Sequence, residues 1–151
     1  IHSGDDFGLN SAGIVVTETT ITGFTGYDPK GIPEFVRARK AMQYAGTIDD
    51  FVRIMKDGNN GGYANTWLLA DTKRNEIGKL ELGLKNVIFS TTTDGYYVGS
   101  NFPEDPKLMR EEAPHYNNKG GNCEARKARW IKHMSQSKGQ IDAQVAEQFL
   151  S

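Results

Sequence analysis

The sequence predicts an α+β fold in which helices cover an antiparallel sheet. Segments rich in β-branched residues, separated by short turns, follow one another in the middle of the chain. Helical patterns occur before and after this set rather than between its members, which disfavours the repeated βαβ units of a parallel sheet. The chain has 151 residues, of which 37% are hydrophobic, so it is long enough to bury a core of its own.

The first part of the chain predicts one strand and two helices. Val, Ile and Thr dominate residues 14–21 and are stiff side chains that pack well on a pleated surface, so this segment predicts a strand. A turn rich in Gly and Pro follows, and the next pattern predicts a helix over 32–45. The residues expected on its apolar stripe are Ile32, Phe35, Val36, Ala41, Met42 and Ala45. Thr47 is a good N-cap for a second helix that ends near Gly58.

The rest of the chain predicts a meander followed by two more helices. Strands are expected at 63–70, 76–84, 86–92 and 96–100. The short connections between them imply antiparallel neighbours. Residues 103–121 carry three prolines and predict a long irregular loop. Helices are expected at 123–136 and 141–150, and we expect the helices at 32–45 and 123–136 to lie on faces of the sheet.

Charge and motif content exclude several classes of function. The formal net charge is -1, so the chain projects no strong field toward nucleic acid. Its apolar runs fall far short of the roughly 20 residues that cross a bilayer. Three scattered histidines and the pair Asp5-Asp6 make no recognisable ligand set, and the glycine-rich stretches match no phosphate-binding motif. We therefore expect no nucleic-acid partner, no transmembrane span, no metal and no cofactor.

Cys123 is the single cysteine and the first candidate nucleophile. It lies at the expected start of a helix, which favours a thiolate, but no histidine stands at a recognisable spacing from it. Free cysteines are also among the most buried residue types. We interpret Cys123 as structural.

Asparagines at strand ends and arginines on a helix are more informative. Asn65 and Asn101 follow turn residues at expected strand ends. A side-chain amide there can donate to the oxyanion that forms when a carbonyl is attacked, although a turn-forming asparagine is the alternative interpretation. Arg126 and Arg129 are three residues apart on one helix face, so one of them can be drawn inward to hold a carboxylate, while a solvated basic face is the alternative.

Several motifs, taken in order, resemble a known family. They are Ser3-Gly4-Asp5-Asp6-Phe7, the segment 10–21 (NSAGIVVTETTI), the segment 63–68 (YANTWL), the segment 99–103 (GSNFP) and the segment 124–130 (EARKARW). Together they resemble the phospholipase B-like and penicillin-type acyltransferase proteins, which are distant relatives of the choloylglycine hydrolases. These are N-terminal-nucleophile hydrolases.

The resemblance implies an αββα sandwich of antiparallel sheets flanked by helices. It also implies a nucleophilic Cys freed by autoproteolysis, whose own α-amino group acts as the base. An α-amino group has an ordinary pKa of about 7.7 to 8, which suits a base at neutral pH. By the same resemblance, Asn101 and Arg129 are expected to be catalytic, and Thr20 and Asn65 are expected to bind substrate.

The sequence departs from the family pattern at its first residue, which is Ile1 rather than a nucleophile. Both ends look cut, so residues 1–151 are expected to be a single domain or a fragment of one. The nucleophile is then expected on an upstream segment or a second chain.

The expected partner is a small-molecule amide or ester: an acylated amine, a peptide-like amide or a lipid. The alternative is a noncatalytic binding or structural domain that retains the fold. The family resemblance implies a secreted, periplasmic or lysosomal location.

Overall fold

The computed structural model describes residues 6–116 and 121–150 and has the expected mixed α+β architecture. One five-stranded sheet forms the centre, with strand order β1-β2-β3-β4-β5 and every neighbouring pair antiparallel. The strands are β1 (Phe7–Leu9), β2 (Ile14–Thr20), β3 (Asn65–Asp71), β4 (Glu76–Leu82) and β5 (Val87–Thr92). The predicted strands at 14–21, 63–70, 76–84 and 86–92 are therefore confirmed, whereas the three-residue β1 was not expected.

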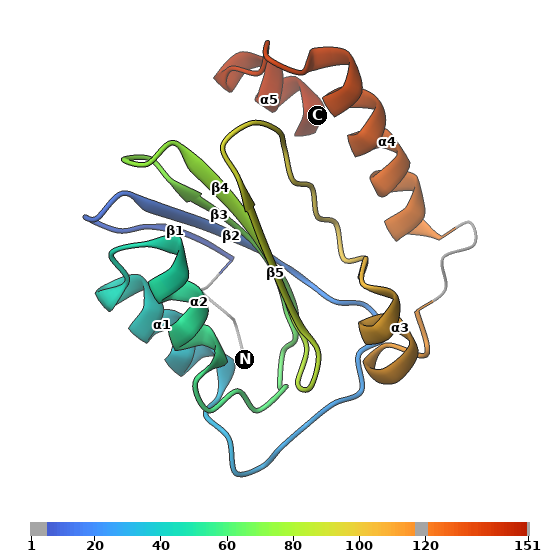
Figure 1. The fold of residues 1–151 in the computed structure, drawn as a ribbon. Helices are drawn as coiled ribbons and strands as arrows, with labels where there is room; N and C mark the ends of the chain where they lie inside the picture. The colour runs from blue at the N-terminus through green and yellow to red at the C-terminus, as the bar shows by residue number, and fades with distance from the viewer. Residues whose placement is uncertain (1–5, 117–120, 151) are drawn as a thin grey trace.

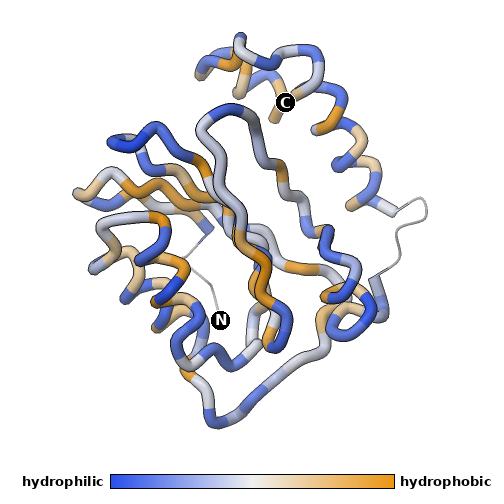
Figure 2. Tube along the Cα trace, in the orientation of Figure 1, coloured by the Kyte–Doolittle hydropathy of each residue, from blue (hydrophilic) through white to orange (hydrophobic). Residues whose placement is uncertain are grey.

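Two helices cover one face of this sheet (Figure 1). They are α1 (Glu34–Tyr44) and α2 (Ile48–Lys56), which correspond to the first two predicted helices. The Thr47 hydroxyl accepts the Asp50 N–H at 3.0 Å and caps α2 as expected. Figure 2 shows hydrophobic stretches along the strands. Alternate strand residues pack with residues of α1 and α2 in one core. The buried core includes Ile14, Val16, Trp67, Leu69, Leu80, Ala38, Ala41, Phe51 and Met55.

The buried stripe of α1 differs from the predicted one. Phe35 and Val36 are 56% and 44% exposed, whereas Arg37 is only 2% exposed. Arg37 donates from Nη1 to the Met55 carbonyl and from Nε to the Ile32 carbonyl, and burial lowers the pKa of its guanidinium. Glu34, Ala38 and Ala41 form the rest of the buried stripe, and Ala45, which caps the helix, is buried beside them.

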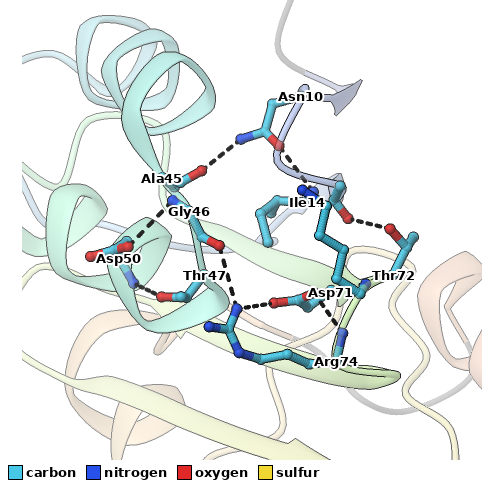
Figure 3. Close-up of polar contacts among 11 residues, drawn as sticks. Asn10, Ile14, Ala45, Gly46, Thr47, Asp50, Asp71, Thr72 and Arg74 are labelled. Atoms are coloured by element: carbon cyan, nitrogen blue, oxygen red, sulfur yellow. Dashed lines mark hydrogen bonds and ion pairs between the residues drawn. The ribbon is translucent and has the colours of Figure 1, made fainter.

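A polar network at one end of the sheet fixes the helices to the strands (Figure 3). Asn10, in the turn between β1 and β2, donates from Nδ2 to the Ala45 carbonyl at 2.8 Å and accepts the Ile14 N–H at 3.0 Å. The Arg74 guanidinium pairs with Asp71 at 2.8 Å, which lowers the pKa of that carboxyl, and also reaches the Gly46 carbonyl. The turn after α1 is therefore held from both the β1–β2 and β3–β4 connections.

The opposite face of the sheet carries the segment that follows β5. This segment turns back beside β5 and descends toward α3 (Figure 1). Tyr97 lies near Val15, Leu68 and Ile77, which point to this face. The predicted strand at 96–100 is wrong, because these residues pair with no strand even though Tyr and Val favour β structure.

The predicted irregular loop at 103–121 contains the short helix α3 (Pro106–Glu112). Asp105 caps it by accepting the N–H groups of Lys107 and Leu108, and Pro106 occupies its first turn. The part of this loop at 117–120 lies outside the described residues.

The last two helices are α4 (Asn122–Ser137) and α5 (Ala143–Leu150), which confirm the predicted pair. Contrary to expectation, α4 buries none of its residues and reaches the chain at 101–102 instead of covering the sheet.

Candidate functional site

Asn101 lies where three segments meet: the end of β2, the chain at 99–102 and the first turns of α4. It adopts φ of 65°, a left-handed conformation that asparagine tolerates better than most residues. Its backbone N–H donates to the Thr19 hydroxyl at 2.7 Å, and its carbonyl accepts the Thr22 N–H at 3.3 Å. The backbone of Asn101 is therefore fixed against the end of β2.

The side-chain amide of Asn101 is oriented from both of its ends. Nδ2 donates to the Thr20 carbonyl at 2.9 Å, and Oδ1 accepts from Nη1 of Arg126 at 3.0 Å. A cation at the amide oxygen withdraws electrons from the amide and makes its N–H groups stronger donors. A primary amide has two N–H groups, so the bond to Thr20 uses one and the second is available to a ligand.

Arg126 is held in place by other residues of α4. Its Nε donates to the Asn122 side chain at 2.6 Å, and its Nη2 lies 3.6 Å from the Cys123 sulfur. Cys123 in turn lies 3.7 Å from the Thr22 hydroxyl, so the thiol sits between α4 and the chain after β2. Lys127 lies over the Phe102 ring at 4.7 Å and adds a second contact between α4 and this segment.

The structure brings three of the four predicted site residues to one end of the sheet. Thr20 and Asn65 are register partners on β2 and β3, and Asn101 contacts Thr20 directly. Arg129 lies one turn beyond Arg126 on α4, where its Nε donates to His133 at 3.2 Å. The contact to Asn101 comes from Arg126, which helical spacing could not distinguish from Arg129 and which the resemblance did not select.

Asn65 is fully buried on the helix-covered face, next to a carboxylate. Its Nδ2 donates to Glu18 at 2.8 Å, and the Tyr63 hydroxyl donates to the other oxygen of Glu18 at 3.1 Å. Burial raises the pKa of the Glu18 carboxyl, and these hydrogen bonds offset the rise only in part. Thr19 and its partner Thr66 point to the opposite face, so this end of β2 and β3 carries polar groups on both faces.

Buried polar atoms without partners gather at the same end of the sheet. Within the described part of the chain, they include Oδ1 of Asn65, Oγ1 of Thr66 and Oγ of Ser100. An unpaired buried polar atom costs about 1–3 kcal/mol, so each calls for an explanation. The chain at Gly99 can lie against Thr19 only because glycine has no side chain. A Cβ there would lie 2.7 Å from the Thr19 methyl. Because Asn65 and Thr66 point to opposite faces of the sheet, the unpaired atoms show a sheet end with polar groups on both faces and not one enclosed site.

Glu81 anchors the chain just beyond Asn101 to the sheet. It is 2% exposed, and its carboxylate accepts the N–H groups of Glu104 at 2.6 Å and Asp105 at 2.9 Å. Lys79, on the same strand, pairs with the Glu104 side chain. Burial raises the pKa of the Glu81 carboxyl, and the two backbone N–H bonds reduce the rise without cancelling it.

This raised pKa predicts a pH-dependent stability. The folded protein holds the Glu81 proton to a higher pH than the unfolded chain, whose value lies near 4.5. The stability that this proton contributes is therefore present below pH 4.5 and is lost as the pH rises through the folded pKa. We expect the Glu81→Gln substitution to lower the melting temperature of the complete protein more at pH 4.5 than at pH 7.5. A difference that is constant or rises with pH would contradict this expectation.

The described residues include no group of three side chains suited to holding a metal ion and no helix that is long and apolar enough to cross a membrane. The arrangement around Asn101 offers neutral amides, hydroxyls and a guanidinium. Such groups bind and polarise a carbonyl rather than a metal.

Comparison with known proteins identifies the family. The family model described as Phospholipase B matches residues 1–143. A protein of Caenorhabditis elegans named "Putative phospholipase B-like 2" is 32% identical in an alignment of 80 residues, and the match covers 49% of this chain. The matched segment spans about 14% of the length of that relative. The motif at residues 3–7 begins outside the described residues, but the other motifs lie on the elements that build the Asn101 site. The chain belongs to the phospholipase B family.

Proposed function

We propose that this protein, when complete, is a hydrolase or acyltransferase that cleaves an ester or amide bond of an acylated small molecule or lipid. Membership of the phospholipase B family supports ester or lipid hydrolysis and does not favour a noncatalytic binding domain. The observation that carries the proposal is the amide of Asn101, fixed between the Thr20 carbonyl and the Arg126 guanidinium beside unpaired buried polar atoms.

The nucleophile in this proposal is an N-terminal Cys outside the 151 residues, on an upstream segment or a second chain. Its thiol attacks the substrate carbonyl, and the proton passes to its own α-amino group. The carbonyl oxygen becomes an oxyanion that accepts the second Nδ2 hydrogen of Asn101. The leaving alcohol or amine then takes the proton, and water or an acceptor alcohol or amine releases the acyl group.

Thr20 and Asn65 are proposed to bind the substrate beside Asn101. Asn65 offers an amide oxygen that has no partner among the described residues, so it can accept an N–H or O–H from the substrate. Arg126 is proposed as the positioning residue for Asn101. The resemblance-based role of Arg129 in the same active-site network stays a prediction.

The second half of the proposal concerns architecture. The face of the sheet that α1 and α2 leave open carries Val15, Leu68, Ala70 and Ile77, and the β1 side chains Phe7 and Leu9 are 79% and 70% exposed. An apolar sheet face of this kind is stable when a second layer covers it. We propose that a second sheet from the rest of the protein packs there and completes an αββα sandwich.

The positioning role of Arg126 gives a test. Arg126→Ala removes the charge-assisted bond to Asn101, so kcat for an ester substrate is expected to fall about 10- to 100-fold. Arg126→Lys keeps a cation and is expected to recover part of the loss. Steady-state kinetics of the complete, processed protein would measure both, with circular dichroism to confirm folding.

Arg129→Ala is the matched control, because it removes the same side chain one turn away. We expect it to lower kcat less than Arg126→Ala does. A large loss in Arg129→Ala with a parent-like Arg126→Ala would transfer the role to Arg129, and parent-like rates in both would exclude a guanidinium from the site.

A further inference from the structure

We infer that Glu18 and Tyr63 position the Asn65 amide so that its oxygen accepts a hydrogen bond from an N–H group of the substrate. This role rests on the proposed function, in which Asn65 binds the substrate. It decides which atom of Asn65 meets the ligand, and therefore which substrates the site favours. Glu18 lies on β2 and Asn65 begins β3, and their side chains meet at the end of the sheet that also carries Asn101.

The Glu18 carboxylate fixes the orientation of the Asn65 amide. An asparagine amide carries a donor and an acceptor of nearly the same shape, so its partners decide which way it lies. An ionised carboxylate can only accept, and Oε2 of Glu18 accepts Nδ2 of Asn65 at 2.8 Å. The amide oxygen, on the other branch, is buried and has no partner among the described residues. A donor from outside these residues would satisfy that oxygen.

Tyr63 holds the Glu18 carboxylate from the other side. Its hydroxyl donates to Oε1 of Glu18 at 3.1 Å. The backbone of Tyr63 has φ of 63°, which is unfavourable for a bulky side chain. The turn before it maintains this conformation, because the side chains of Asn59 and Asn60 each accept the backbone N–H two residues further on, at 3.0 and 2.9 Å. Strain that the surrounding structure maintains is typical of functional sites.

A second carboxylate, that of Asp6, makes the charge of Glu18 sensitive to pH. The Asp6 carbonyl accepts the Glu18 N–H at 2.9 Å, and the Asp6 side chain is hydrogen-bonded to the Glu18 carboxyl. Burial is the largest cause that raises the pKa of the Glu18 carboxyl, and Asp6 adds to the rise. The hydrogen bonds from Asn65 and Tyr63 lower this pKa.

The charged groups of the two covering helices have partners of their own or are at least partly exposed. On α1, Arg37 lies beside Glu34 and donates to two backbone carbonyls. The partly or fully exposed charged residues of α1 and α2 are Arg39, Lys40, Asp49, Asp50, Arg53 and Lys56. Asp6 is therefore the charged neighbour that shifts the Glu18 carboxyl.

Protonation of Glu18 is expected to release the Asn65 amide. A neutral carboxyl accepts more weakly than a carboxylate and offers an O–H donor of its own, so it no longer holds the amide in one orientation. The pKa of Glu18 in the folded protein lies above 4.5. We expect KM for a substrate with an N–H beside its scissile carbonyl to rise about tenfold as the pH falls through this value, the loss typical of one hydrogen bond to a charged group.

Steady-state kinetics of the complete, processed protein with two substrates test this role. Hexanoyl para-nitroanilide has the amide N–H, whereas para-nitrophenyl hexanoate lacks it. We expect KM for the anilide to follow the ionisation of Glu18 and KM for the ester not to follow it. Asp6→Asn is expected to move the rise in KM to lower pH, and Tyr63→Phe to move it to higher pH, because Asp6 raises and Tyr63 lowers the pKa of Glu18. In Glu18→Gln, KM for the anilide is expected to stay constant with pH.

Asp94→Asn and Tyr44→Phe are the matched controls, because they make the same chemical changes at exposed residues. Both are expected to keep the parent pH profile. A residue with a merely structural role would change KM for both substrates together and would not move the profile. Unmoved profiles in Asp6→Asn and Tyr63→Phe, or shifts in the same direction, would overturn the inference.

The side-chain amide signals of Asn65 in nitrogen-15 NMR spectra report on Glu18 without turnover. They are expected to titrate with the same two opposite shifts in Asp6→Asn and Tyr63→Phe. If they do so but neither substrate is cleaved, the proposed function fails, whereas the positioning of Asn65 by Glu18 stands. If both substrates are cleaved with KM values that do not depend on Glu18, the positioning role alone fails.

Discussion

Asn101→Asp is expected to lower kcat for an ester or amide substrate by about 10²- to 10³-fold, the loss typical of one oxyanion donor. The substitution keeps the size of the side chain but replaces the Nδ2 donor with a carboxylate oxygen. That oxygen would face the lone pairs of the Thr20 carbonyl oxygen and the negative charge of the developing oxyanion, and it would be repelled by both. The other carboxylate oxygen would still accept a hydrogen bond from Arg126, and this bond would hold the side chain in its present orientation.

Steady-state kinetics of the complete, processed protein would measure this loss as a fall in kcat. Asn101→Ala is expected to cost less, because it removes the donor without adding a negative charge. The chain offers a matched control in Asn75, another asparagine with positive φ, of 52°, in the exposed turn between β3 and β4. Asn75→Asp is expected to turn over substrate at the parent rate. If Asn101→Asp did the same, Asn101 would be a turn residue and the oxyanion donor would lie elsewhere.

The strands and most helices could be predicted because their signals are local. The β-branched residues of β2 and the N-cap Thr47 of α2 act on residues next to them in the chain. The short stretch of sequence around each is therefore enough to predict the element. The strand β1 is too short for its alternation to be recognised. The segment 96–100 has strand-forming residues, but it pairs with no strand. Pairing depends on the tertiary fold, so the β propensity of single residues cannot predict it.

The candidate site could be predicted in its residue types but not in its contacts. Asn101 was singled out by its place at an expected strand end and Thr20 by the resemblance, and their hydrogen bond joins residues 81 positions apart. The choice between Arg126 and Arg129 depends on the rotation of α4 about its axis. Apolar periodicity sets that rotation when a helix buries a stripe, but α4 buries none of its residues, so the pattern could not decide.

Glu112 was missed entirely, and its removal is expected to have the largest effect on stability. This last residue of α3 is 3% exposed, and its carboxylate accepts four hydrogen bonds. Oε1 accepts the N–H groups of Leu84 and Lys85 at 2.9 and 2.8 Å, and Oε2 accepts the backbone and side-chain N–H groups of Asn86 at 2.8 and 3.0 Å. No sequence pattern reveals these partners, because most are backbone groups far along the chain.

The turn between β4 and β5 is built around this carboxylate. A Cβ on Gly83 would lie 2.5 Å from Oε2 of Glu112 and 2.8 Å from the Asn86 carbonyl oxygen, so a larger residue there would force the turn to shift. The Gly83 N–H closes the turn by donating to the Asn86 carbonyl at 3.0 Å. Glu112 thus ties α3 to the sheet, and α3 follows directly on the segment that carries Asn101.

Glu112→Gln is expected to lower the free energy of unfolding by about 3–5 kcal/mol, the range for removing one member of a buried charged network. The amide nitrogen of Gln can only donate, so it would oppose at least one of the backbone N–H groups and leave that group buried without a partner. Urea unfolding of the complete protein, monitored by circular dichroism, would measure the change. Glu111→Gln is the control. Glu111 is the neighbouring residue, but it is partly exposed, and of the groups in this turn it contacts only the Asn86 side chain. Its substitution is expected to lower the free energy of unfolding by less than about 1 kcal/mol. Equal losses in the two variants would show that the carboxylate of Glu112 does not hold the turn.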